Sequence, residues 1–195
     1  MNINRSGLIV FILGIFLIND LQSQTQTFRP ADNSFIKVTG TSTLHDWELI
    51  SEDINSELRF ETGDNGQPEK LESVSFTLNK KTLRSDKSGL DRRAYEALDA
   101  SRYPEIVFRT NGSGRLEKDG DTYRINSTGE LSVAGVSRKI TVQTTCINGD
   151  DNRLQCSGSQ KLNMSDFNID PPVMMLGALR TGDEITVSYN IVFVQ

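Results

Sequence analysis

The sequence alternates apolar and polar residues in short segments separated by turn-forming residues, and this pattern constrains the fold more than any other feature. Near the end of the chain, every second position is apolar: Ile185, Val187, Tyr189, Ile191 and Phe193. Successive side chains of a β-strand point to opposite faces, so this period predicts a strand with one buried face. Seven more segments show similar runs, at residues 34–40, 48–61, 71–79, 105–116, 123–133, 137–147 and 154–162. The sequence therefore predicts an all-β domain of about eight strands.

Clusters of Gly, Asn and Asp at residues 63–66, 118–121 and 148–152 are typical of tight turns between antiparallel neighbours. One stretch breaks the strand pattern, because residues 90–98 are rich in helix formers. A helix there places Leu90, Ala94 and Leu98 on one side, and we expect one short helix. Eight antiparallel strands with one helix close as a barrel or stack as a sandwich, and strand number alone does not decide between them.

The N-terminus has the form of a cleavable secretion signal. Arg5 precedes an almost unbroken apolar run at residues 8–18, which ends at Asn19 before the length of about 20 residues that a spanning helix needs. We expect a signal peptide over residues 1–23, a polar leader over 24–33 and one domain over 34–195. This division predicts a periplasmic or secreted protein that does not span the membrane.

Composition excludes one class of partner. The formal charge is -5 and the isoelectric point is near 5.0, and no Lys/Arg stripe with interleaved aromatic residues is present. Nucleic acid is therefore not an expected partner. No bound cofactor or metal is expected either, since the sequence lacks ligands at suitable spacing.

Two cysteines, Cys146 and Cys156, flank a turn-forming segment and face each other across the hairpin expected around Asp151. In an oxidising compartment such a pair favours a structural disulfide. Free thiols are the alternative, because sequence does not fix cysteine pairing.

His45 is the only histidine of the chain. Its neighbour Asp46 would point to the opposite face of an extended strand, so the two do not form a catalytic dyad. A structural hydrogen bond or a contact to a ligand headgroup is the favoured interpretation. Trp47 is interpreted as a core residue, with stacking on a ligand as the alternative. No serine lies in a Gly-x-Ser-x-Gly nucleophile elbow, and we do not expect the protein to be an enzyme.

Four segments, in this order, resemble the YceI-like family: residues 38–47 (VTGTSTLHDW), 103–108 (YPEIVF), 129–140 (GELSVAGVSRKI) and 166–172 (DFNIDPP). The family often has Gly after the Asp-Phe pair, where this chain has Asn168, a residue that also tolerates left-handed backbone. The resemblance implies a lipocalin-like, eight-stranded antiparallel barrel whose apolar tunnel holds a polyisoprenoid, an isoprenoid quinone or a similar amphiphile.

The residues expected to line the tunnel are the inward positions of the strands and an apolar run in an expected loop at residues 171–179. That run either caps the core or lines the cavity mouth, and the resemblance favours lining. The candidates are Val74, Phe76, Leu78, Ile106, Phe108, Met174, Met175, Leu176, Tyr189 and Ile191, with His45 as the candidate headgroup contact.

The expected function is binding of a hydrophobic small molecule or lipid for transport, storage or sequestration. One alternative is a ligand-free interaction module of the cell envelope with its interior filled by side chains. The other is an enzyme that acts on a lipid with His45 as acid or base. The sequence also leaves a homodimer open.

Overall fold

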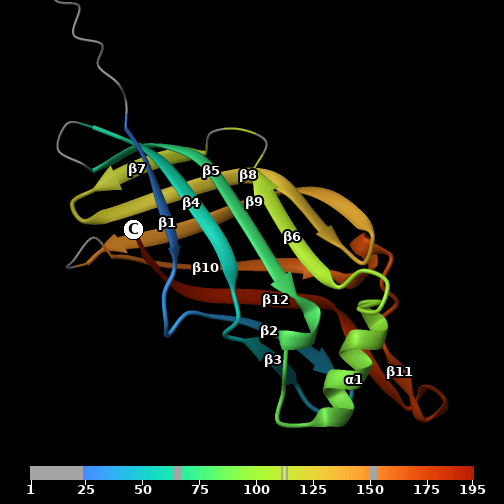
Figure 1. Ribbon diagram of the computed structural model, residues 1–195. Helices are drawn as coiled ribbons and strands as arrows, with labels where there is room; N and C mark the ends of the chain where they lie inside the picture. The colour runs from blue at the N-terminus through green and yellow to red at the C-terminus, as the bar shows by residue number, and fades with distance from the viewer. Residues whose placement is uncertain (1–23, 64–66, 111, 113, 150–152) are drawn as a thin grey trace, which may run out of the picture.

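The computed structural model describes residues 24–63, 67–110, 112, 114–149 and 153–195. One antiparallel sheet dominates this part of the chain (Figure 1). Its strands are β1 (Gln24–Pro30), β2 (Phe35–Ser42), β3 (Trp47–Ser51), β4 (Asn55–Thr62), β5 (Pro68–Asn79), β6 (Glu105–Thr110), β7 (Arg115–Asp119), β8 (Thr122–Val133), β9 (Val136–Asn148), β10 (Leu154–Asn163), β11 (Val173–Met174) and β12 (Leu179–Val194). The remaining elements are the helix α1 (Ser88–Ala97) and the 3-10 turns η1 (Lys80–Thr82), η2 (Met164–Phe167) and η3 (Met175–Gly177).

Eight strands close into a barrel in the order β1-β4-β5-β6-β8-β9-β10-β12. The ring closes where Arg29 pairs with Val194 and Pro30 with Phe193. The predicted eight-stranded antiparallel barrel is thus confirmed, and the sandwich alternative is wrong. Over the rest of its length, β12 pairs with β2 instead of β1, and β3 extends the wall beyond β2.

The strand boundaries differ from the prediction at three places. Residues 24–33, expected as a polar leader, contain strand β1, whose Phe28 is buried opposite Leu58. The run at 48–61 divides into β3 and β4, and the run at 105–116 divides into β6 and β7. A single apolar residue gave β1 too weak a pattern to detect, since strand pairing and not burial holds most of its length. The signal peptide expected over residues 1–23 lies outside the described residues.

The expected turn chemistry is present in the hairpin between β7 and β8, where Gly120 adopts φ +60°. Asn168, which stands where the family often has Gly, follows η2 with φ 56° and ψ 31°. This is the left-handed conformation that Asn tolerates better than most residues. Cys146 and Cys156 are paired across β9 and β10 and form a disulfide, which confirms the predicted hairpin pairing.

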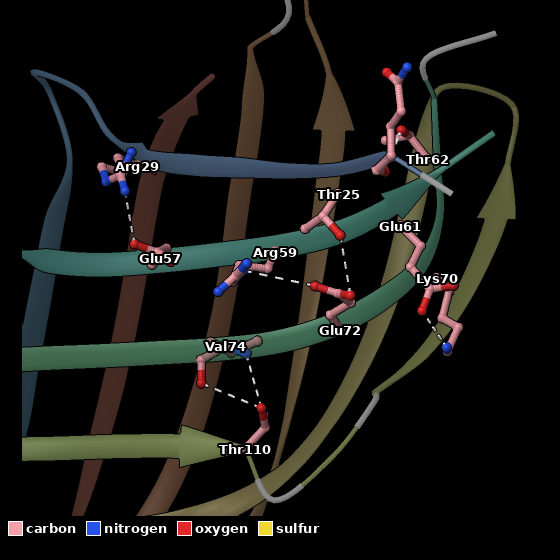
Figure 2. Close-up of polar contacts among 11 residues, drawn as sticks. Thr25, Arg29, Glu57, Arg59, Glu61, Thr62, Lys70, Glu72, Val74 and Thr110 are labelled. Carbon is pink, nitrogen blue, oxygen red and sulfur yellow. Dashed lines mark hydrogen bonds and ion pairs between the residues drawn. The ribbon is translucent and has the colours of Figure 1, made fainter. Parts of the chain in front are cut away.

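The largest of three core clusters among the described residues fills one end of the barrel, and we call it the packed core. It joins β1, β4, β5 and the disulfide hairpin through Phe28, Phe60, Leu71, Tyr123 and Leu154, all buried. The rings of Phe28 and Phe60 meet edge to face, with centroids 5.8 Å apart. On the outside of the same end, charged side chains form pairs between β1, β4 and β5, including Arg29 with Glu57 (Figure 2). Such exposed pairs contribute little to stability, so burial of the apolar core holds this end together.

Helix α1 lies at the other end, near β11 (Figure 1). Its inner side carries Leu90 and Ala94, with Leu98 at the C-cap, as the helical period predicted. These three pack against a second buried cluster, formed by Ile36, Leu49, Leu78 and Leu83. The segment after β5 holds the helix through polar contacts. The buried Lys80 donates its Nζ hydrogen bond to the Leu98 carbonyl at 2.8 Å, and Tyr95 Oη donates to the Leu83 carbonyl at 2.7 Å.

Candidate ligand-binding cavity

An apolar cavity of about 1190 Å³ occupies the half of the barrel that the packed core leaves open. Its floor includes Leu58, Ile125, Cys156, Ile191 and Phe193, which belong to the packed core. Its walls come from the barrel strands and from β2 and β3, and α1 borders its mouth. Exposed residues of the lining, including Leu44, His45 and Lys87, lie at the helix end, so the cavity is a blind tunnel that opens there.

The alternation seen in the sequence explains why these walls are apolar. On β12, Ile185, Val187, Tyr189 and Ile191 all line the cavity. The residues between them point to the other face because strand side chains alternate. The same rule places Ile140, Val142 and Thr144 of β9, and Val74, Phe76 and Leu78 of β5, along the interior.

Two glycines make room for aromatic rings beside the cavity. A Cβ at Gly40 would overlap the Trp47 indole, and a Cβ at Gly158 would overlap the Tyr189 hydroxyl group. The Trp47 Nε1 donates to the Thr41 carbonyl at 3.2 Å. Trp47, expected to be a core residue, packs against the buried cluster of Ile36, Leu49, Leu78 and Leu83, and it also lines the cavity.

A few polar groups lie within the apolar wall. The hydroxyl groups of Tyr189 and Thr144 are 2.7 Å apart, and Tyr189 Oη also donates to the Gln143 carbonyl at 3.4 Å. Burial raises the pKa of the Tyr189 phenol, although the hydrogen bond with Thr144 opposes the shift. The phenol therefore stays neutral at physiological pH, and the wall adds no charge at this depth.

The mouth, in contrast, is charged. Four cationic side chains border the cavity there, from Arg84, Lys87, Arg93 and Arg180. Three carboxylates border it as well, from Asp46, Glu48 and Asp86. Glu48 is ion-paired with Lys37 at 3.0 Å. An amphiphile with an apolar chain in the tunnel would have its polar end among these groups.

Most predicted lining residues lie where the alternation placed them. Seven of them border the cavity: Val74, Phe76, Leu78, Ile106, Phe108, Tyr189 and Ile191. Their contact with a ligand stays a prediction. The side chains of Met174 and Met175 lie outside the described part of the structure.

Leu176 requires a correction. It is not among the residues that line the cavity, and its side chain is fully exposed. The residue sits in the turn after β11 with φ 57° and ψ 31°, and this turn points it away from the barrel. A loop run of apolar residues indicated burial, but the hairpin that β11 forms with β12 carries its tip into solvent.

His45 lies in the turn between β2 and β3, at the cavity mouth, with an exposed side chain. Its backbone nitrogen donates to Ser42 Oγ at 3.2 Å, and Ser42 Oγ donates to the His45 carbonyl at 2.6 Å. This local turn fixes the backbone at His45 and leaves its imidazole at the rim. Contact with a ligand headgroup stays a prediction.

Sequence reasoning missed several parts of the wall. Ile36 and Val38 on β2, Ile140 and Val142 on β9, and the inner side of α1 all border the cavity. The alternation in residues 34–40 and 137–147 could have identified the strand positions. The helix could not have been placed over the opening, because that position depends on the Lys80 and Tyr95 contacts rather than on any periodic pattern.

Two features are absent from the described residues. No group of three or more His, Cys, Asp or Glu side chains among them is arranged to hold a metal ion. Within the same residues, no helix has both the length and the apolar character to cross a membrane.

A closed antiparallel barrel with an apolar interior that opens at one end defines a class of protein that encloses one small or slender ligand. Residues 22–193 match the model of the YceI-like domain. The chain belongs to this family, as the four sequence segments indicated.

Solved structures share the fold. BcnA of Burkholderia cenocepacia is 17% identical, with a TM-score of 0.63 over 82% of this chain and 95% of that one. A domain from Saccharophagus degradans, described as polyisoprenoid binding and implicated in plant cell wall breakdown, is 10% identical, with a TM-score of 0.62 over 86% and 97% of the two chains. The YceI protein of Campylobacter jejuni is 20% identical, with a TM-score of 0.54 over 73% and 81%. Comparison with curated proteins gave no match.

Proposed function

We propose that this chain is an exported binding protein that holds a long apolar amphiphile, such as a polyisoprenoid or an isoprenoid quinone, inside the barrel for transport, storage or sequestration. The apolar cavity of about 1190 Å³ carries this proposal. Pockets for drug-sized ligands are about 300–1,000 Å³, so this cavity has room for a larger molecule. The Saccharophagus domain, described as polyisoprenoid binding, shares the fold.

The energetics of such a complex favour a long chain over a specific headgroup. Each buried CH2 group contributes about 0.8 kcal/mol, and the wall offers apolar contacts along most of its length. The polar end of the ligand would lie at the mouth, where His45, Arg84 and Arg93 are available for hydrogen bonds or ion pairs. Binding would thus select a slender apolar molecule with a polar end.

The interior argues against the ligand-free interaction module. In that alternative, side chains fill the barrel and leave a cavity volume near zero, whereas the cavity here is large. Export is supported by the sequence of residues 1–23, with its charged start, apolar run and small residue before Gln24. Export would place the barrel in an aqueous compartment beside a membrane, where an apolar molecule needs a carrier.

Solvent extraction of the purified exported protein, followed by mass spectrometry, tests the proposal. We expect a long apolar amphiphile near one molecule per chain. Repeated recovery of empty protein that also fails to take up an added polyprenyl quinone would contradict it.

A matched pair of variants ties the extracted molecule to the cavity. Val142→Trp places a large side chain in the tunnel, whereas Lys139→Trp places the same side chain at an exposed position of the same strand. We expect Val142→Trp to lower the ligand content severalfold or to select a shorter chain. Lys139→Trp should leave the ligand unchanged, and equal losses in both variants would indicate a general defect instead.

A further inference from the structure

Exposed apolar side chains gather at the open end of the barrel. Four large apolar residues are exposed in the described part of the chain. Three of them, Leu44, Val173 and Leu176, lie at the cavity mouth, in the β2–β3 turn and in the β11–β12 hairpin, with exposed fractions of 68%, 58% and 110%. The fourth, Ile147, lies in the disulfide hairpin at the packed end. Scattered single apolar residues are ordinary on a protein surface, but a cluster at one end marks an interaction site.

The two loops form one surface. The Thr43 backbone nitrogen donates to the Arg180 carbonyl at 3.0 Å, and the Arg180 nitrogen donates back to Thr43 Oγ1 at 3.2 Å. Thr43 Oγ1 also donates to the Ala178 carbonyl at 3.3 Å. These bonds fasten the turn that carries Leu44 to the β11–β12 hairpin that carries Val173 and Leu176. In Figure 1 the hairpin that carries β11 projects beyond the barrel beside α1.

The tip of this hairpin exposes an apolar residue in a strained backbone conformation. Leu176 adopts a left-handed backbone conformation, with φ 57° and ψ 31°. Gly or Asn would occupy this conformation with less strain than Leu. A strained and fully exposed leucine gains nothing from water, so this side chain is a candidate for burial against a partner.

The charge around this apolar surface selects the partner. The chain carries a net charge of -5, yet four cations and three carboxylates border the mouth, and Lys37 neutralises Glu48. Near the hairpin, Glu184 pairs with Lys161 at 2.7 Å, whereas Asp170 and Asp183 form no ion pair with a described residue, and Asp183 accepts from Ser165. The cavity rim, with four cations against three carboxylates, is still more cationic than the rest of this acidic protein. Exposed apolar side chains beside a rim that carries Arg and Lys favour a surface of anionic lipid, because the apolar tips enter the acyl boundary while the cations meet the headgroups.

We propose that the β11–β12 hairpin, together with the turn at Leu44, docks the open end of the barrel on an anionic lipid bilayer. Docked in this way, the cavity mouth faces the membrane and an amphiphile passes between bilayer and tunnel without crossing water. The docking rests on the proposed function only for its purpose. Val173 and Leu176 on the hairpin do not line the cavity, although Leu44 and the cations border its rim.

Flotation with large unilamellar vesicles tests the docking. We expect the mature protein to float with vesicles of phosphatidylglycerol and phosphatidylethanolamine. Binding to phosphatidylcholine vesicles, or binding in 0.5 M salt, should be several times weaker, because salt shortens the Debye length to between about 3 and 10 Å and screens the charges. Leu176→Ser should weaken binding about tenfold. The double variant Arg84→Gln with Lys87→Gln should also weaken binding to the anionic vesicles about tenfold and reduce its salt dependence.

Two controls lie at the opposite end of the barrel. Ile147→Ser removes the remaining exposed apolar side chain of the described residues, and Arg153→Gln removes an exposed cation beside it. Both variants should float like the unmodified protein. Failure of the unmodified protein to float, or equal losses in the Ile147 and Leu176 variants, would overturn the docking. A dimer in solution that Leu176→Ser dissociates would overturn it as well, because a second copy would then cover the surface.

The two proposals fail separately. Solvent extraction reports the ligand whether or not the protein meets a membrane, and flotation of ligand-depleted protein reports docking whether or not the tunnel is filled. Recovery of lipid without flotation would therefore contradict the docking surface alone.

Discussion

The two ends of this barrel are built from the same alternating strands but differ in what fills them. At the closed end, β1 brings Phe28 against Phe60, and Tyr123 and the disulfide complete a solid core. At the open end, the inward positions are mostly aliphatic, including Ile140, Val142 and Val187, and they surround empty volume. The comparison teaches that alternation decides which side chains point inward, while their size decides whether the interior is packed or hollow.

The difference also separates stability from binding. A close-packed interior gains burial and dispersion from every side chain, whereas the wall of a cavity has partner atoms on one side only. We therefore expect the closed end to supply most of the free energy of folding. The open end keeps its shape through the continuous strands and through polar contacts that hold α1.

The largest expected effect comes from truncating one phenylalanine at each end. Phe60 is buried in the packed core, and Phe76 is partly exposed to the cavity. Phe60→Ala should lower the free energy of unfolding by about 3–5 kcal/mol, since it opens a new cavity. Phe76→Ala should lower it by about 1–2 kcal/mol, because it enlarges a cavity that already exists. Urea unfolding measures both values, and equal losses would break the comparison.

The disulfide gives the next effect. Cys146 and Cys156 close a hairpin with a sequence separation of 10 residues at the packed end. Replacing both with Ser should lower the free energy of unfolding by about 2–3 kcal/mol, mainly through the entropy of the unfolded chain. Ligand recovery by solvent extraction should be unchanged at temperatures where the variant stays folded. A large loss of ligand from folded protein would show that the two ends are not separable.

Lys80 tests the polar contacts at the open end. Its ammonium group is buried and donates to the Leu98 carbonyl next to α1. Lys80→Met removes this bond and should lower the free energy of unfolding by about 1–2 kcal/mol at neutral pH. Circular dichroism in urea measures the difference, and Lys81→Met, at an exposed position beside it, is the control.

The same lysine predicts a dependence on pH. Burial lowers the pKa of Lys80 below its ordinary value of 10.5, and the charge of Asp99 only partly opposes this. Between the lowered pKa and 10.5, the unfolded chain binds a proton that the folded chain lacks. The stability contributed by this group therefore rises with pH across that window. We expect the rise in the unmodified protein and not in Lys80→Met, and a parallel pH profile for both would contradict the assignment.

The sequence predicted the barrel well where burial imposes a strong pattern. On β12, alternation placed every second residue from Ile185 to Phe193 along the cavity, and the turn-forming residues between the two cysteines predicted the hairpin of β9 and β10. Strand β1 could not be predicted, because only Phe28 marks its buried face. Its place is set by pairing with β4 and β12, a contact between segments far apart in the chain.

The cavity was less predictable than its lining. Alternation identified Phe76, Ile106 and Tyr189 as inward, yet inward positions at the closed end are packed and those at the open end are not. The volume of the cavity depends on the sizes of side chains that come from several strands and the helix. No local sequence pattern predicts how these sizes add up in space. The Leu176 error has the same origin, since an apolar loop residue is buried or exposed according to where its hairpin points.

Trp47 allows the most direct test of the central claim, that the open half of the barrel encloses one long amphiphile. It is the only tryptophan of the chain, and it lines the cavity. Titrating ligand-depleted protein with a polyprenyl quinone should quench its fluorescence, with saturation near one quinone per chain. A quinone with the same headgroup and no prenyl chain should not saturate in that range. Quenching that is absent, or that rises without saturation for both quinones alike, would contradict the account.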